Sequence, residues 1–249
     1  MTADKLKLND DKTELIVIGT RAQLDKISIS ELRIDHVIVS AVCNVRNLGT
    51  WFDNHLSMKT AINKTCQSEL YHLHNIGRIK RFLSFEDRKS IVHAVVMSRM
   101  DYCNSLLYGV AATNQFQRVQ NAAVRLVWSL PRHEHVTSLF IRLHWLPIKL
   151  RINFKIAMLC FKWIHGHAPN YLKRMVAIQK TSIYNLRSST SIQLEDHSRR
   201  SKETLGDRAF SNASAKIWNS LPKSLQSQQN FNTFKSLLKT HHFREAFNL

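Results

Sequence analysis

Glycine and proline are scarce in this chain, and their scarcity narrows the fold class. Only 6 glycines and 4 prolines occur among 249 residues. Turns between strands draw heavily on these two residue types, so a turn-rich β architecture is disfavoured and helices are favoured. The apolar content of 44% is sufficient for a packed core in one or two domains.

The cysteines are also few, and their spacing argues against a zinc site. Cys43, Cys66, Cys103 and Cys160 include no C-x-x-C pair, whereas a zinc knuckle needs closely spaced soft ligands to complete a tetrahedron. No local histidine pair has a cysteine at ligand spacing, so the histidines are expected on polar faces or in the core. Reduced, mostly buried thiols in an intracellular protein are the expectation.

Long apolar segments are missing as well. The longest apolar stretches, at 106–112 and 156–161, are far shorter than the roughly 20 residues that span a bilayer. The first five residues lack the apolar region of a secretion signal. The sequence therefore predicts a soluble protein that is not secreted, lies in the nucleus, the cytoplasm or both, and has no membrane partner.

Acidic residues are half as numerous as basic ones, which gives a net charge of +18 and a pI of about 10.1. Residues 1–53 hold 7 Lys and Arg against 8 Asp and Glu, so residues 54–249 hold the other 29 against 10. Such a surplus is costly as self-repulsion unless a polyanion is bound, so nucleic acid is the predicted partner. Solvated lysine-rich faces that maintain solubility are the alternative.

Residue patterns that could perform chemistry are equally sparse. The paired Asp10-Asp11 stands at the entry to a predicted strand, where an Asx-type turn explains it better than the metal-binding aspartates of a polymerase. Neither Glu86-Asp87 nor Glu195-Asp196 belongs to a catalytic arrangement, and no glycine-rich phosphate loop is present. The sequence predicts that this chain alone is not an enzyme and holds no metal or other cofactor.

The period of the apolar residues changes near residue 56. Before it, β-branched runs predict strands at Thr13–Thr20, Val37–Val42 and Cys43–Phe52, the last broken at Gly49. After it, apolar residues recur every three or four positions, which predicts helices. These run over about 56–82, 84–107, 113–130, 148–165, 208–221 and 231–247. Residues 180–205 are polar and aperiodic, which predicts a loop or hinge.

Polar residues ahead of these helices predict where four of them begin. Ser84 and Asp87 form a capping box, in which the hydroxyl and the carboxylate bond to otherwise free backbone N–H groups. Thr113, Asp207 and Asn230 are the predicted N-caps of three others.

Basic residues share faces on three of the predicted helices. Because each helical residue turns by about 100°, side chains four or seven positions apart lie within about 40° of one another. The shared faces comprise Arg151, Lys155 and Lys162, then Lys235, Lys239 and His242, and finally Arg118 and Arg125. A basic stripe beside an apolar stripe suits a helix that packs on its own core and lies along a phosphate backbone.

Seven short motifs, in order along the chain, resemble one family. LNDDKTE at 8–14 and VRNLGTWFD at 45–53 resemble the end of the palm of a reverse transcriptase from a jockey-like LINE (non-LTR) retrotransposon. The likeness continues in RMDYCNSLLYG, RVQNAAVRL, LHWLP, YNLRS and IWNSLP, which begin at 99, 118, 143, 184 and 217. The family's endonuclease, fingers and catalytic aspartates are missing. The resemblance implies the thumb and C-terminal region of a truncated RNA-directed DNA polymerase.

The resemblance also implies roles for two features of the first segment. Lys12 matches a palm lysine thought to help protonate pyrophosphate, so it is a candidate general acid, with a solvated turn lysine as the alternative. Asn47, Leu48 and Gly49 resemble the primer grip, where glycine permits close backbone approach, although an ordinary hairpin fits equally well. The full polymerase would need Mg²⁺. This fragment would bind the RNA/DNA template–primer duplex and no small-molecule substrate.

These observations predict an α+β, mostly α-helical chain. Residues 1–53 are the expected palm remnant with a small β-hairpin or sheet, 54–179 a helical thumb-like bundle, 180–205 the hinge and 206–249 the C-terminal helices. Two functions follow from the sequence. One is a reverse transcriptase fragment that binds template–primer nucleic acid without catalysing its extension. The alternative is a non-catalytic helical interaction module or an inert retrotransposon remnant.

Overall fold

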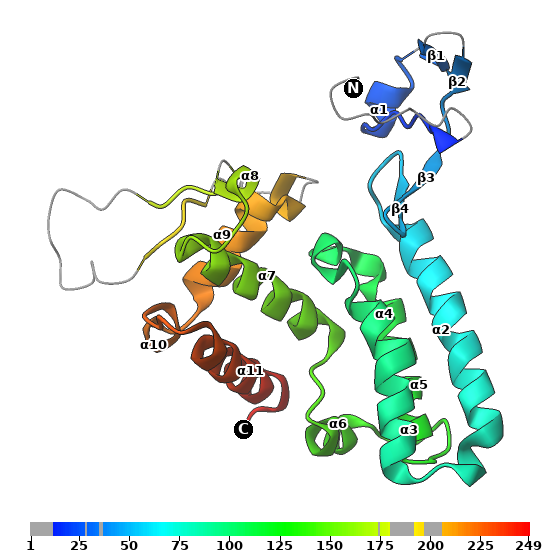
Figure 1. Cartoon of the computed structure of the whole chain (residues 1–249), viewed down its shortest axis with the longest axis vertical. Coiled ribbons are helices and arrows are strands. Elements are labelled where there is room, and N and C mark those ends of the chain that lie inside the picture. Colours follow the sequence, from blue (N-terminus) through cyan, green and yellow to red (C-terminus); the bar gives the residue numbers. More distant parts are fainter. Residues whose placement is uncertain (1–11, 28, 35–36, 174, 180–191, 197–205) are drawn as a thin grey trace, which may run out of the picture. The chain divides into compact units, whose positions relative to one another are not determined.

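The computed structural model describes residues 12–249 except 28, 35–36, 174, 180–191 and 197–205 (Figure 1). This described part contains two antiparallel hairpins and is otherwise mostly helical, which confirms the predicted α+β, mostly α-helical class. The chain divides into two compact units, residues 1–65 and 66–249. The division falls inside α2 (Lys59–Ile79), twelve residues beyond residue 53, where the palm remnant was expected to end.

The first unit holds two separate two-stranded sheets. β1 (Glu31–Ile34) pairs with β2 (Val37–Ser40), and β3 (Asn44–Asn47) pairs with β4 (Thr50–Asp53), both antiparallel. The predicted strand at 13–20 is wrong, because only Leu15 forms a bridge, to Ala41. A β-branched run becomes a strand only when a neighbour satisfies its backbone groups along its length. Here the chain instead turns into the short α1 (Arg21–Leu24).

Asp53 ties the end of β4 to the start of α2 within the first unit. Its carboxylate is buried and accepts hydrogen bonds from the backbone N–H groups of Ser57 and Met58, both at 2.8 Å, and of His55 at 3.1 Å. Burial raises the pKa of this carboxyl, but the bonds from Ser57, Met58 and His55 outweigh it and hold the pKa below its usual value. Asp53 therefore stabilises this corner as an anion.

The second unit begins with the greater part of α2, followed by α3 (Phe85–Val92), a π-helical turn (His93–Met97) and α4 (Ser98–Asp101). The predicted capping box is confirmed: Asp87 N–H donates to Ser84 Oγ at 3.1 Å, and Ser84 N–H to the Asp87 carboxylate at 3.2 Å. The helix predicted to reach residue 107 ends at Asp101, because Cys103 adopts a left-handed conformation with φ of 53°.

Two predicted caps are wrong, and one is confirmed. At the start of α5 (Asn114–Val127), the Thr113 hydroxyl donates to the Val110 carbonyl at 2.8 Å and caps no N–H. Asp207 lies buried in a 3₁₀ turn, and α9 (Phe210–Ser220) begins three residues later. Asn230 does cap α11 (Phe231–Phe247), since its side-chain oxygen accepts from two backbone N–H groups at 2.9 and 3.1 Å.

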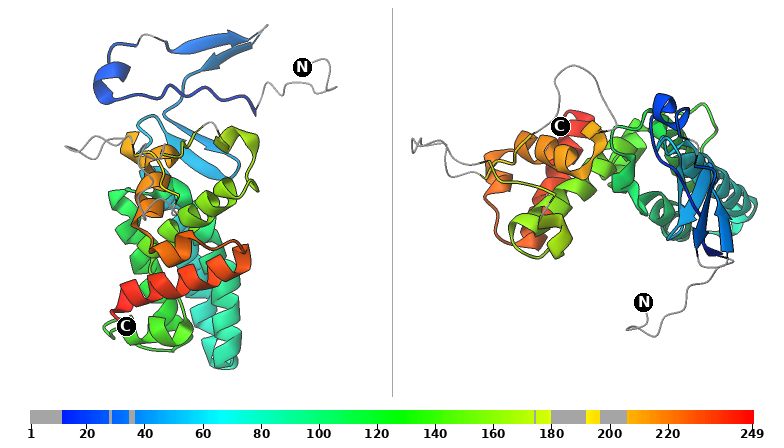
Figure 2. Two further views of the ribbon diagram at one scale, coloured as in Figure 1. Left: turned by 90° about the vertical axis from the view of Figure 1, so that its left-hand side faces the viewer. Right: turned by 90° about the horizontal axis from the view of Figure 1, so that it is seen from above.

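The remaining helices complete the second unit. They are α6 (Thr137–Leu143), α7 (Ile148–Ile164), α8 (Asn170–Lys173) and α10 (Lys223–Gln226). α7 packs against both α9 and α11 (Figures 1 and 2). Their core is aromatic: Phe161 stacks on Phe234 with ring centroids 4.4 Å apart, and Trp218 lies 5.9 Å from Phe234. This cluster fixes how α7 and α11 face each other.

Two sequence expectations concern thiols and membranes. All four cysteines are free, and Cys66 and Cys160 are buried as predicted, whereas Cys103 is half-buried and Cys43 is exposed. None of the helices in the described ranges is both long and apolar enough to cross a membrane.

The predicted loop at 180–205 lies mostly outside the described residues. Within it, Leu194 is buried and its N–H donates to the Asn219 side chain at 2.9 Å.

Candidate nucleic-acid interface

One cleft in the second unit gathers cations from two of the predicted basic stripes. Arg151 and Lys155 reach it from α7, and Lys235 and Lys239 reach it from α11. Each pair is four residues apart on its helix, so both members lie on one face. The cleft has a volume of about 500 Å³. Packing of α7 on α11 thus brings together two pairs of basic residues that are eighty or more residues apart in sequence.

The floor of this cleft is aromatic and its rim is polar. Trp145 is buried on the floor, with its ring centroid 6.3 Å from that of His93. His144, in a left-handed conformation with φ of 54° at the end of α6, also lines the cleft. Asp101 is the one acidic residue among the described residues of the lining, where basic side chains outnumber it. The sequence stretch LHWLP carried a family resemblance but gave no sign that its His and Trp line a cationic cleft.

Asp101 neutralises one of the four cations. Arg151 Nε donates to Asp101 Oδ1 at 2.8 Å, and Arg151 Nη2 pairs with Asp101 Oδ2. Asn104 donates to the same carboxylate at 3.3 Å. A bidentate pair of this kind is directional and strong. Arg151 therefore links α7 to the end of α4, which leaves three lysines as the other cations of the cleft.

Lys155, Lys235 and Lys239 are all exposed. Within the part of the chain that the structure describes, no ion pair engages any of the three. An exposed ammonium group that is not paired with a carboxylate can bind an anion from solution, because no existing ion pair has to be broken first. The three lysines are candidates for contacts to a phosphate backbone.

The other predicted cations lie elsewhere on the second unit. Lys162 extends over the Phe231 ring, with Nζ 4.9 Å from the centroid, and does not line the cleft. Arg118 is exposed on α5, while Arg125 on the same face donates from Nε to the Glu134 carbonyl at 2.9 Å. The basic residues of α5 and those of the cleft therefore do not form one site.

His242 was expected beside Lys235 and Lys239 on the basic side of α11, and this expectation is wrong. Its ring is buried, and Nδ1 lies 3.0 Å from a Glu245 carboxylate oxygen. Burial lowers the pKa of His242, and the hydrogen bond to Glu245 opposes this only in part. Together with His241 these residues place three ligand atoms within 4.8 Å of one another, but an arrangement of this kind needs further partners to define a metal site.

The hairpin of the first unit carries the residues that resemble a primer grip. Leu48 and Gly49 form the two-residue turn between β3 and β4, with φ values of 46° and 86°. Positive φ at both central positions matches the right-handed twist of the flanking strands. Asn47 and Leu48 are exposed, Leu48 by 84%. Lys12 is also exposed, while Asp10 and Asp11 lie outside the described residues.

Comparison with known proteins adds no assignment. No protein-family model, no curated protein and no solved structure gives a significant match to this chain.

Proposed function

We propose that this chain is the end of the palm, the thumb and the C-terminal region of a non-LTR retrotransposon reverse transcriptase, and that it holds template–primer nucleic acid without catalysing its extension. The single observation that carries the binding proposal is the cleft between α7 and α11, where Lys155, Lys235 and Lys239 stand without carboxylate partners among the described residues. The seven motifs that resemble this family, in order along the chain, support the proposed origin from a retrotransposon.

The cleft suits a phosphate backbone better than a compact anion. One of its lysines comes from α7 and the other two lie one turn apart on α11, so they meet successive charges rather than converging on one. Lysine ammonium groups contact phosphates without reading base sequence. Binding through them is expected to be largely independent of sequence and to weaken steeply with salt, because counterions are released from the nucleic acid.

The test is the salt dependence of binding to an RNA/DNA hybrid duplex. The variant Lys155→Gln/Lys235→Gln/Lys239→Gln keeps the helix-forming propensity of α7 and α11 and removes three charges. Each lost contact flattens the slope of log K against log salt by about one unit, so the triple variant is expected to lose about three. Binding should weaken for all sequences alike.

A matched control removes the same charge elsewhere. Lys26, Lys59 and Lys223 are exposed and none lines the cleft, so changing all three to Gln should leave the slope within about one unit of the original. Equal slopes for the two triple variants would show that net charge alone attracts nucleic acid. The cleft would then have no special role.

One observation favours the alternative of a protein-interaction module. Tyr71 on α2 is 64% exposed, and Phe82, just after α2, is 74% exposed. Large exposed apolar side chains that gather on one surface are typical of contact surfaces. If the cleft variant binds nucleic acid normally, while Tyr71→Ser/Phe82→Ser abolishes association with a protein partner, the interaction module becomes the better description.

A further inference from the structure

A second cavity of the 66–249 unit lies between the loop after α4, the first turns of α7, and α9. Its volume is about 370 Å³, within the roughly 300–1,000 Å³ of small-molecule pockets. The floor is apolar: Leu107, Val110 and Ile152 are each at least 93% buried. None of its described lining residues also lines the cleft between α7 and α11.

The rim of this cavity is cationic. Three cations line it: Lys149 on α7, Lys216 on α9 and Arg208 in the preceding 3₁₀ turn. Among the described lining residues, Asp207 contributes the one carboxylate. In the described ranges neither Lys149 nor Lys216 is engaged in an ion pair. An anionic group at the rim would therefore meet at least two ammonium groups.

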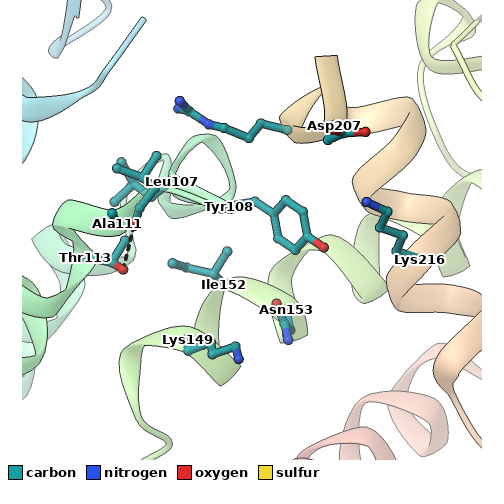
Figure 3. A pocket seen from close by; sticks show the side chains of 12 residues that line it. Leu107, Tyr108, Ala111, Thr113, Lys149, Ile152, Asn153, Asp207 and Lys216 are labelled. Carbon is teal, nitrogen blue, oxygen red and sulfur yellow. Dashed lines mark hydrogen bonds between the residues drawn. The ribbon is translucent and has the colours of Figure 1, made fainter. Parts of the chain in front are cut away.

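An aromatic ring and an amide stand between floor and rim. Figure 3 shows the Tyr108 ring extending toward Lys216, with Ile152 and Asn153 on the adjoining side. Tyr108 is half-buried and lines the cavity. A flat ring beside an amide and above an apolar floor can hold a nucleobase, which offers an apolar face and a polar edge.

Gly109 makes room for the Arg208 side chain. Its φ is +68°, and a Cβ there would lie 3.0 Å from Arg208 Cγ and 3.6 Å from Cδ. The arginine stem thus lies directly on the glycine backbone. Any larger residue at position 109 would strain the loop and push this cation away from its place at the rim.

We infer that this cavity binds one unpaired nucleotide of a single strand, with its base against Tyr108 and Ile152 and its phosphate at Lys149 and Lys216. A base that is still paired in a duplex cannot enter a cavity of this size, so the ligand is an unpaired position. The inference deepens the proposed function, because it adds a single-strand site to the duplex-binding cleft.

The experiment uses the full chain and a single-stranded RNA of about ten nucleotides that carries 2-aminopurine, a fluorescent adenine analogue, at its centre. Stacking on an aromatic ring quenches this probe. We expect quenching on binding, no quenching when the same probe is paired in a blunt duplex, and weak competition by free AMP. Inorganic pyrophosphate should compete less well than AMP.

Two substitutions at one position separate stacking from folding. Tyr108→Leu removes the aromatic face and should abolish quenching and weaken binding by about tenfold, because stacking on one aromatic ring is worth about 1–3 kcal/mol. Tyr108→Phe keeps the ring and should preserve both. Lys149→Gln/Lys216→Gln should flatten the salt slope for the single strand by about one to two units.

Several results would overturn the inference. Unchanged quenching in Tyr108→Leu would show that the base does not meet this ring. Pyrophosphate that competes as well as AMP would show an anion site only, and equal quenching in the duplex would exclude an unpaired base. If Tyr108→Leu does not fold, the double lysine variant still decides, because an unchanged salt slope for the single strand would show that its phosphate does not meet Lys149 and Lys216. The cleft variant should lose duplex affinity while keeping the quenching, so the two proposals fail separately.

Discussion

Glu69 is a buried carboxylic acid whose ionisation should make the stability of this protein depend on pH. Its side chain is 1% exposed, on the inner face of α2, and neither carboxylate oxygen has a hydrogen-bond donor among the described residues. The nearest cation is Arg99, with Nη1 3.8 Å away. Arg99 is also bonded to Ser68 and His72, at 3.0 and 2.8 Å, so it compensates the Glu69 charge only in part.

Burial raises the pKa of Glu69 from 4.5 to about 7, against the opposing effect of Arg99. A pKa that is raised in the folded state means that folding favours the protonated acid. The associated stability is fully present below about pH 4.5 and is lost progressively as the pH rises through about 7. At about 1.36 kcal/mol per pKa unit, the loss is about 3 kcal/mol, a large share of the 5–15 kcal/mol that typically stabilises a domain.

The assay is urea unfolding followed by circular dichroism at several pH values, for the original chain and Glu69→Gln. The amide is nearly the same size and cannot ionise, so the difference between the two unfolding free energies should grow by about 3 kcal/mol in favour of the variant from pH 4.5 to pH 8. Glu86→Gln removes a carboxylate that is 71% exposed and serves as the control. Parallel curves for Glu69→Gln and the original chain would refute the reasoning.

Three further outcomes are expected. Primer extension on poly(rA)/oligo(dT) with Mg²⁺ should give no product, because the sequence offers no aspartate pair on a polymerase hairpin to hold the two ions; extension that vanishes when Asp10 and Asp11 become Asn would contradict this. Asp53→Ala should destabilise the first unit by about 1–2 kcal/mol, as loss of a helix cap does, and hydrogen exchange at the Met58 N–H should accelerate; unchanged exchange would mean that other groups hold this corner. Arg151→Gln and Asp101→Asn should each destabilise the second unit, and the double variant should cost less than their sum by about 0.5–3 kcal/mol; strict additivity would show that the pair observed between α4 and α7 contributes no coupling.

Local signals predicted the helices well and the sheet poorly. The capping box at Ser84 and the cap at Asn230 involve residues two or three positions apart, so the sequence contains all that is needed to predict them. The strand expected at 13–20 depended on a partner along its whole length, and among the described residues the fold supplies a bridge from Leu15 to Ala41 and a backbone hydrogen bond from Gly19 N–H to the Asn54 carbonyl. Pairing of that kind is decided by tertiary structure, which periodicity does not report.

For the candidate sites too, the sequence predicted local features but not the contacts that tertiary structure creates. Helical spacing placed Lys155 and Lys239 on basic faces, but their convergence depends on the packing of Phe161 against Phe234. The pairing of Arg151 with Asp101 spans fifty residues and has no local signature. Nothing in the sequence indicated the smaller cavity, because its cations come from three separate segments and none of them belongs to a predicted basic stripe.

The turn between β3 and β4 places a residue type where backbone energetics disfavour it. Leucine in the left-handed region costs on the order of 1–2 kcal/mol, whereas asparagine or glycine would adopt it more easily. Leu48 nonetheless occupies this position and is 84% exposed. Backbone strain and an apolar group in water therefore coincide at the tip of one hairpin. The tip of this hairpin is therefore locally less stable and exposes an apolar side chain to water. Any surface that covers Leu48 would regain the part of this free energy that comes from the exposure.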